Sequence, residues 1–218
     1  MSNALDFAKV FLKRGLDTNR DTYDGNMKLQ KLLFFSNLVS IAEKGKPLFT
    51  DPIYAFSNGC VIENVRLRYK NDCKSLCDDS AAYDPDLTQD EYDVINLTAD
   101  IFGKLSAREL SELNHSFDFW KNAYEHSKQP DGYKDKNLAI VTYSEMQPEI
   151  NKIKTVIDCF KSNKAERTLK EVVNGITFYY SPDMEITDDI LEQLDIFSKS
   201  AEDESYSVYK ENGELVIY

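Results

Sequence analysis

The chain has 218 residues, 42% of them hydrophobic and 12% aromatic, so it is long enough and apolar enough to bury a sizeable core. Its formal net charge is −12. An acidic surface repels phosphate, which disfavours direct binding to DNA or RNA and suits a basic protein partner, although a solvated surface explains the same charge.

The charge is unevenly distributed along the chain. Residues 1–164 carry 22 Lys/Arg and 25 Asp/Glu, a net charge of −3, whereas residues 165–218 carry 4 and 13, a net charge of −9. Because composition shifts at the same point, we expect a helical domain over residues 1–164 and an acidic α+β extension over residues 165–218.

The four cysteines are too few and too scattered for a disulfide scaffold, and no basic segment followed by an apolar signal core opens the chain. We therefore expect a reduced cytoplasmic location and no membrane span. Cys73 and Cys77 are spaced to share one helix face, but their acidic neighbours and a total of two histidines do not match a zinc pattern. We expect neither a metal nor a cofactor.

A first helix is predicted from the cap Asn3 to about Arg14, with Gly15 as its stop. Residues 17–26 are polar and rich in turn formers, which predicts a connector. Residues 27–42, MKLQKLLFFSNLVSIA, then carry apolar side chains on all sides of a helix about 24 Å long. A helix that is apolar all round is buried, so we expect the other segments to surround this one.

Gln30 and Lys31 interrupt the apolar helix, and their polar ends need partners. We favour a tie between this helix and residues 47–59, and the alternative is that both residues face a gap in the surrounding helices. The helix ends near Gly45 and Pro47. Prolines and glycines then predict an irregular segment, followed by a helix from about Val61 to residue 71 and an acidic loop over residues 72–87.

Two capping boxes follow, Thr88 with Glu91 and Ser106 with Glu109, each of which opens a helix. Ser144 is predicted to cap an outer helix over residues 145–160. A short helix over residues 167–173, a strand over residues 176–180 and a helix capped by Thr187 come next. Asn212-Gly213 predicts a hairpin in which Val208 faces Ile217. The hairpin and the strand form a three-stranded sheet in this interpretation.

Three blocks of this sequence resemble the Panacea domain of bacterial and phage antitoxins, a family that includes SocA-like adaptors and GepA-like phage-associated proteins. The blocks are LQKLLFF at residues 29–35, GKPLF with DPIYAFSNGCVIENV at residues 45–65, and NHSFDFWKNAY at residues 114–124. The chain departs from the family pattern at Phe56 (usually Trp), at Asn58 and Cys60 (usually Tyr and Pro) and at Asn114 (commonly Thr). The motif residues are Leu29, Gln30, Lys31, Leu32, Gly45, Pro47, Leu48, Phe49, Gly59, His115 and Trp120.

His115 and Trp120 lie in the third block, but the sequence contains neither a nucleophile turn nor a glycine-rich phosphate loop. We therefore interpret His115 as a buried, hydrogen-bonded packing residue and Trp120 as a core anchor, and we expect no enzyme activity. The fold class that follows is mainly α with a small antiparallel sheet, in which a helical bundle surrounds a central buried helix and a β-hairpin ends the chain.

The resemblance implies an antitoxin that neutralises a cognate protein toxin by direct binding. The alternative is a phage-derived regulatory or anti-defence protein, or a SocA-like proteolytic adaptor, that acts on a host protein. Tyrosines of the acidic tail are equally typical of a binding surface and of a small sheet's own core. We expect the partner, which the acidity predicts to be basic, to contact Asp188, Asp189, Glu192, Asp195, Tyr206, Tyr209 and Tyr218.

Overall fold

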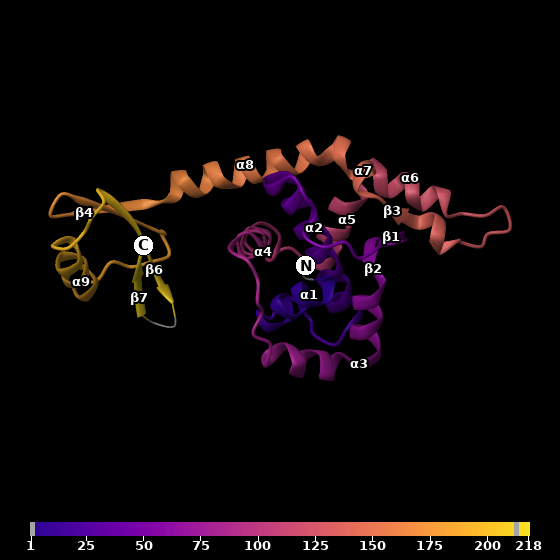
Figure 1. The fold of residues 1–218 in the computed structure, drawn as a ribbon, viewed down its shortest axis with the longest axis horizontal. Coiled ribbons are helices and arrows are strands. Elements are labelled where there is room, and N and C mark those ends of the chain that lie inside the picture. The colour runs from indigo at the N-terminus through magenta and orange to yellow at the C-terminus, as the bar shows by residue number, and fades with distance from the viewer. Residues whose placement is uncertain (1–2, 212–213) are drawn as a thin grey trace. The chain divides into compact units, whose positions relative to one another are not determined.

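A computed structural model describes residues 3–211 and 214–218, except for the side chains of residues 164–167 (Figure 1). The chain divides into two compact units, Met1–Ile157 (unit 1) and Asp158–Tyr218 (unit 2). Each unit has its own cluster of buried apolar residues. Helix α8 (Ile150–Arg167) contains the boundary between them.

Unit 1 is organised around the long helix α2 (Tyr23–Lys44), which starts four residues earlier than predicted because Thr22 Oγ1 accepts the N–H of Gly25 at 3.0 Å. The helix ends at Gly45, which has a left-handed φ of 72°. Its apolar side chains are buried on all sides, and Leu29, Leu32 and Leu33 are fully inaccessible to solvent. The predicted central buried helix is therefore confirmed.

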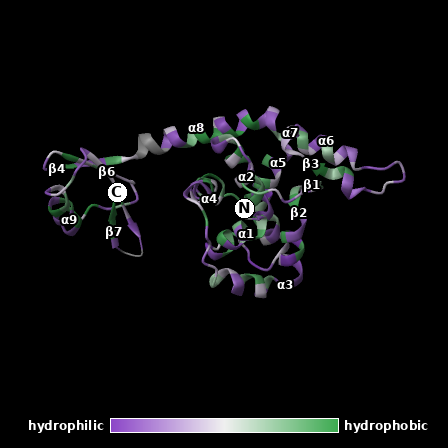
Figure 2. Cartoon of the chain, viewed as in Figure 1, coloured by the Kyte–Doolittle hydropathy of each residue, from purple (hydrophilic) through white to green (hydrophobic). Residues whose placement is uncertain are grey.

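Helix α2 is surrounded by α1 (Ala4–Lys13), α3 (Glu63–Ala81), α4 (Gln89–Phe102) and α5 (Ala107–His115). Helix α6 (Asp118–His126) packs against α5 and reaches α2 through a ring contact between Phe119 and Phe34. Rings from these elements meet at Phe35, which stacks on Phe102 with centroids 4.5 Å apart. Asn3 caps α1, and both predicted capping boxes form. Figure 2 shows the apolar residues of unit 1 gathered around α1 and α2.

The segment that we expected to be irregular contains a β-hairpin, formed by β1 (Ile53–Phe56) and β2 (Gly59–Ile62). Strand β3 (Ile140–Val141) pairs with the other edge of β1, giving the order β2-β1-β3. All four residues of β2 are buried, so this strand is a continuous apolar run without the alternation that would mark it in the sequence. The prediction of an irregular segment was wrong here.

Helix α3 is also longer than predicted. It bends at Asp72 (φ −157°, ψ 62°) and continues to Ala81 through the acidic residues that we interpreted as a loop. Cys73, Leu76 and Ser80 prolong its buried face beyond the bend. Packing of that face therefore overrides the weak helical preference of the exposed acidic positions.

The predicted outer helix is split into three pieces, α7 (Tyr143–Met146), the 3₁₀ turn η2 (Gln147–Glu149) and α8, preceded by the 3₁₀ turn η1 (Lys136–Ala139). Its cap is Thr142, which forms a capping box with Glu145, so the assignment of Ser144 as the cap was wrong. The 3₁₀ turn contains Pro148, which lacks the N–H that an uninterrupted helix needs. The apolar face survives the interruption, since Met146, Ile150, Ile153 and Ile157 are all buried.

The described residues of unit 2 form a four-stranded sheet and one helix after the end of α8. Its strands are β4 (Leu169–Val173), β5 (Ile176–Tyr180), β6 (Ser205–Glu211) and β7 (Glu214–Ile217), in the order β4-β5-β6-β7. β5 and β6 run parallel and the other pairs antiparallel, so the sheet is mixed. Helix α9 (Asp188–Ser198) follows Thr187 as predicted, although the Thr187 side chain makes no capping hydrogen bond.

The β6–β7 hairpin has the predicted register, with Val208 opposite Ile217 and Glu211 opposite Glu214, while its turn residues Asn212 and Gly213 lie outside the described part of the chain. The predicted helix over residues 167–173 was wrong, because this segment is β4. Asn174 (φ 51°) and Gly175 (φ 87°) form the two-residue turn that joins β4 to β5. The sequence signal for this β4–β5 hairpin was therefore a second Asn-Gly pair, Asn174-Gly175, which follows Val172 and Val173 of β4.

Candidate functional site

The β1–β2 hairpin is tied to the buried helix by two polar side chains of α2. Gln30 Oε1 accepts the backbone N–H of Ile62 at 2.9 Å, and Lys31 Nζ donates to the carbonyl of Cys60 at 2.9 Å. Both side chains are buried. The tie that we expected to residues 47–59 is thus made to strand β2, just beyond that range.

The backbone after Gly45 is held by two other residues of α2. Asn37 Oδ1 accepts the N–H of Leu48 at 2.7 Å, and Ser40 Oγ donates to the carbonyl of Lys46 at 2.8 Å. Asn37 and Ser40 were not among the predicted residues, although they are polar residues of the same apolar helix as Gln30 and Lys31. Of the other motif residues, Leu29, Leu32, Leu48 and Phe49 are core residues, and Pro47 is half-buried.

Side chains from the third signature block, together with Ser111 just before it, hold the hairpin turn from the opposite side. Asn114 Oδ1 accepts the N–H of Cys60, Ser111 Oγ donates to the carbonyl of Asn58 at 2.9 Å, and Trp120 Nε1 donates to the carbonyl of Phe56 at 3.0 Å. The three blocks of the family signature therefore converge on one turn. Ser111 and Asn114 were not among the predicted residues.

Gly59 is the point where the three blocks come closest. Its φ of +98° is a conformation that side chains with a Cβ rarely adopt. A Cβ placed there would overlap the side-chain amide of Asn114 and would lie 2.8 Å from Lys31 Nζ. Both the backbone conformation and the space around it therefore require glycine.

Burial changes the ionisation of the groups around this turn. It lowers the pKa of Lys31, which is 1% exposed, to about 8, and raises the pKa of the Cys60 thiol to about 12. Cys60 therefore stays protonated and is a poor nucleophile. Desolvation, and then the positive charge of Lys31, lowers the pKa of His115, so its imidazole is neutral near pH 7.

His115 stacks on Trp120 with ring centroids 4.0 Å apart. Its Nε2 is buried, and no hydrogen-bond partner for it lies in residues 3–211 or 214–218. The ring thus packs against Trp120, but His115 is half-buried rather than buried as predicted, and one of its nitrogens is unpaired.

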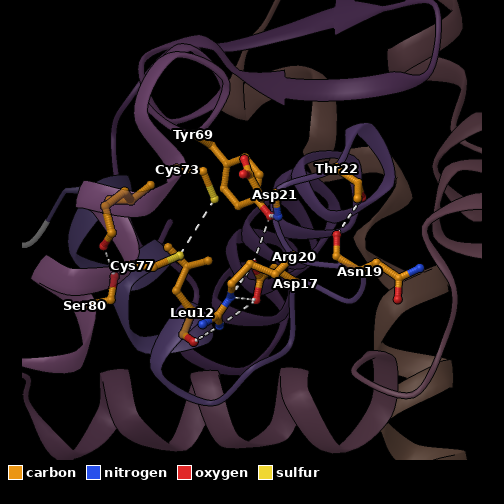
Figure 3. Close-up of polar contacts among 11 residues, drawn as sticks. Leu12, Asp17, Asn19, Arg20, Asp21, Thr22, Tyr69, Cys73, Cys77 and Ser80 are labelled. Carbon is orange, nitrogen blue, oxygen red and sulfur yellow. Dashed lines mark hydrogen bonds and ion pairs between the residues drawn. The ribbon is translucent and has the colours of Figure 1, made fainter.

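A second buried polar cluster fixes the connector between α1 and α2 (Figure 3). Asp17 is 1% exposed and forms an ion pair with Arg20 at 2.9 Å. The hydroxyl of Tyr69 donates to Asp17 Oδ2 at 2.9 Å and accepts the N–H of Asp21 at 2.8 Å. The polar composition of residues 17–26 predicted a connector but not this cluster, because the partner residue lies in α3.

Cys73 and Cys77 lie beside this cluster with their Sγ atoms 3.8 Å apart (Figure 3), so the helix face predicted from their spacing is real. Burial raises the pKa of the Cys77 thiol to about 11, which keeps it protonated. Within the described residues, no three His, Cys, Asp or Glu side chains lie close enough together to hold a metal ion.

The residues expected to contact a partner lie on different faces of unit 2. Tyr206 packs against Phe178 and Phe197 on the side of the sheet covered by α9, and its hydroxyl accepts the N–H of Asp203 at 2.8 Å. Tyr209 and Tyr218 follow the inward-facing residues Val208 and Ile217, so they lie on the opposite face of the sheet. They are 42% and 71% exposed, and their ring centroids are 5.6 Å apart.

The acidic candidates all belong to α9. Asp188, Asp189 and Glu192 are exposed, whereas Asp195 is partly buried and pairs with Lys199 at 2.7 Å. Ile190 and Leu194 hold α9 against the sheet face that contains Phe178. The structure thus brings Tyr209 and Tyr218 together, and it separates them from Tyr206 and from the acidic side chains.

Fold and site together define an α+β scaffold domain in which three sequence blocks hold a β-hairpin against a buried helix. The family described as Antitoxin SocA-like, Panacea domain, matches residues 29–121, which confirms the resemblance over this part of the chain. The match indicates a role related to toxin–antitoxin systems. No curated protein and no solved structure matches the chain. Among the described helices, none is long and apolar enough to cross a membrane.

Proposed function

We propose that this protein is an antitoxin that neutralises a cognate protein toxin by direct contact and without catalysis. The match of residues 29–121 to the antitoxin-like Panacea domain carries the proposal. The chemistry of the signature residues supports it, because Cys60 and Asn114 are engaged in hydrogen bonds that hold the hairpin, and Lys31 donates to the same turn. Such a domain offers a partner a rigid surface rather than a reactive group.

The partner surface that we propose lies in unit 2. The signature residues are largely buried, so contacts that distinguish one toxin from another need exposed residues elsewhere. Tyr179, Tyr209 and Tyr218 lie on the sheet face opposite α9, which we call the outer sheet face, and each is at least 42% exposed. Tyrosine suits a binding surface because it supplies a large contact area at little cost in side-chain entropy.

Charge and strand geometry favour a basic partner at this face. Residues 165–218 carry a net charge of −9, which would accelerate association with a basic protein and make the rate fall with salt. Strand β7 pairs with β6 on one side only within the described chain, so its other edge offers backbone groups for strand addition.

The experiment that tests the proposal is co-expression with the products of the adjacent open reading frames. We expect one of them to be toxic alone, to be neutralised by the full chain, and to co-purify with it. Residues 1–163 alone should stay folded but should no longer neutralise. This cut removes all of unit 2's sheet, whereas a cut after residue 174 would leave β4 unpaired.

Matched variants locate the contact. Tyr209→Ala with Tyr218→Ala should weaken toxin binding, whereas Tyr133→Ala, at an exposed tyrosine of unit 1, should not. Full neutralisation by residues 1–163 would place the contact surface on unit 1. If no neighbouring product is toxic, the alternative role, binding of a host protein, replaces the antitoxin proposal.

A further inference from the structure

Unit 1 contains a pocket of about 440 Å³ between the first half of α2, the hairpin turn and the first turns of α3. We call it the α2–α3 pocket. Its walls include Tyr23 and Met27 from α2, Phe56 from the hairpin, and Arg66 and Lys70 from α3. The volume falls within the range of about 300–1,000 Å³ that small-molecule sites occupy.

The lining is basic although the protein is acidic. It includes three cationic side chains, Lys31, Arg66 and Lys70, and one carboxylate, Asp21 at the exposed rim. Arg66 donates from Nε to Glu63 at 2.7 Å, and its terminal nitrogens have no hydrogen-bond partner in the described residues. Lys70 is exposed and forms no ion pair within the same residues. Several N–H donors of this pocket are therefore free to bind an anion.

Lys31 adds a donor group that is hidden from bulk solvent. Its ammonium has three N–H bonds, and the part of the chain that the structure describes supplies one acceptor, the carbonyl of Cys60. A buried ammonium with unfilled donors is costly, and a ligand oxygen would reduce that cost. The lowered pKa of Lys31 reflects the same shortage of compensating partners.

The other side chains that line the pocket carry planar groups or are apolar. The Arg66 guanidinium lies over the Phe56 ring, 5.9 Å from its centroid, and Tyr23 is 69% exposed at the pocket mouth. Met27 and Val61 complete an apolar wall. Aromatic rings and a stacked guanidinium favour a planar group, because rings stack on both.

We propose that the α2–α3 pocket binds a small organic anion in which a carboxylate or phosphate is attached to a planar ring, of up to about nucleotide size. The anionic group binds Arg66 and Lys70, and the ring lies against Phe56 and Met27. This pocket is lined by residues of unit 1, so the proposal does not depend on the partner surface proposed in unit 2.

The test uses the full-length protein and four probes. Adenosine monophosphate links a phosphate to a planar base through ribose, and indole-3-acetate links a carboxylate to a planar ring through a methylene. Adenosine and indole-3-acetamide are their uncharged counterparts. Each is titrated to about 5 mM, which detects weak binding, while backbone amide shifts and heat release are recorded. We expect at least one anion to bind with a submillimolar Kd and to shift the amides of Met27, Ser57 and Val61. Its uncharged counterpart should bind about tenfold more weakly or not at all.

Variants tie the binding to the pocket. Arg66→Gln should weaken the anion about tenfold, and Met27→Trp, which fills the pocket without changing its charge, should abolish binding. Arg108→Gln removes a similarly paired arginine of α5 and should leave binding unchanged. The proposal is overturned if neither anion shifts the three amides, if the uncharged probes bind equally well, or if binding survives both Arg66→Gln and Met27→Trp.

Discussion

Lys31 and Asn114 hold the two backbone groups of one residue from opposite sides, because Lys31 Nζ donates to the Cys60 carbonyl while Asn114 Oδ1 accepts the Cys60 N–H. The first residue belongs to α2 and the second to α5, 83 positions later in the chain. The hairpin turn is therefore fixed only when helices from both ends of the family signature are in place.

Gly59→Ala should destabilise unit 1 by at least about 2 kcal/mol, since it combines strain at positive φ with overlap against Asn114. Gly45→Ala is the matched control. Gly45 has a similar φ of +72°, but a Cβ there meets no atom within 4 Å, so this change should cost about 1 kcal/mol. Urea unfolding followed by circular dichroism measures both, and equal costs would show that the space around Gly59 does not matter.

Lys31→Met should alter how stability depends on pH. Burial lowers the pKa of Lys31 from 10.5 to about 8, so between these values the unfolded chain binds the proton more tightly than the folded chain does. The free energy of unfolding therefore rises from pH 8 toward pH 10.5, by about 3 kcal/mol in total for this group. Lys31→Met should lack this rise, and the exposed Lys104→Met should keep it. Urea unfolding of the wild type and both variants at pH 7.5 and 9.5 measures this rise. If the free energy of unfolding changes equally with pH in all three proteins, the low pKa does not belong to Lys31.

Leu33→Asp should unfold unit 1, because Leu33 is fully buried and the substitution puts an unpaired charge into the core. Leu113→Asp is the control, since Leu113 is 42% exposed on α5. Thermal melting of both variants by circular dichroism is the measurement. A Leu33→Asp protein that melts within a few degrees of wild type would mean that α2 is peripheral.

Tyr69→Phe should cost about 1–3 kcal/mol, because it removes the hydroxyl that donates to the buried Asp17 and accepts from Asp21 N–H. Tyr83→Phe removes a hydroxyl that bonds Asp6 at 3.0 Å in a partly exposed setting, and it should cost less. Chemical denaturation of the two variants compares them. The importance of the Asp17 cluster would be refuted by a Tyr69→Phe protein as stable as Tyr83→Phe.

The sequence predicted those elements whose signals are local. The buried helix showed itself by apolar residues on all sides, the capping boxes by residues three apart, and the β6–β7 register by one Asn-Gly pair. The β1–β2 hairpin and the second half of α3 were missed because their reasons are not local. All residues of β2 are buried, and α3 continues past Asp72 only because Cys73 and Leu76 find a core to pack against.

In the candidate site, too, local signals were predicted from the sequence and long-range contacts were not. Gln30 and Lys31 were recognised as needing partners, since polar residues are conspicuous in an apolar helix. Their actual partners, and the contributions of Asn114 and Asp17, depend on contacts across 29 to 54 positions of sequence. Nothing in the local pattern near Asp17 indicates that Tyr69 will reach it.

The parallel pairing of β5 with β6 makes α9 the link between two small hairpins, β4–β5 and β6–β7. A single two-stranded hairpin is marginal in water, so neither half would hold its shape without the other. A peptide bond cleaved anywhere between residues 181 and 204 would leave the halves joined only by non-covalent contacts, and neither hairpin alone would be a stable fragment. Unit 2 should consequently resist proteases as a whole or be lost as a whole, with no stable intermediate length.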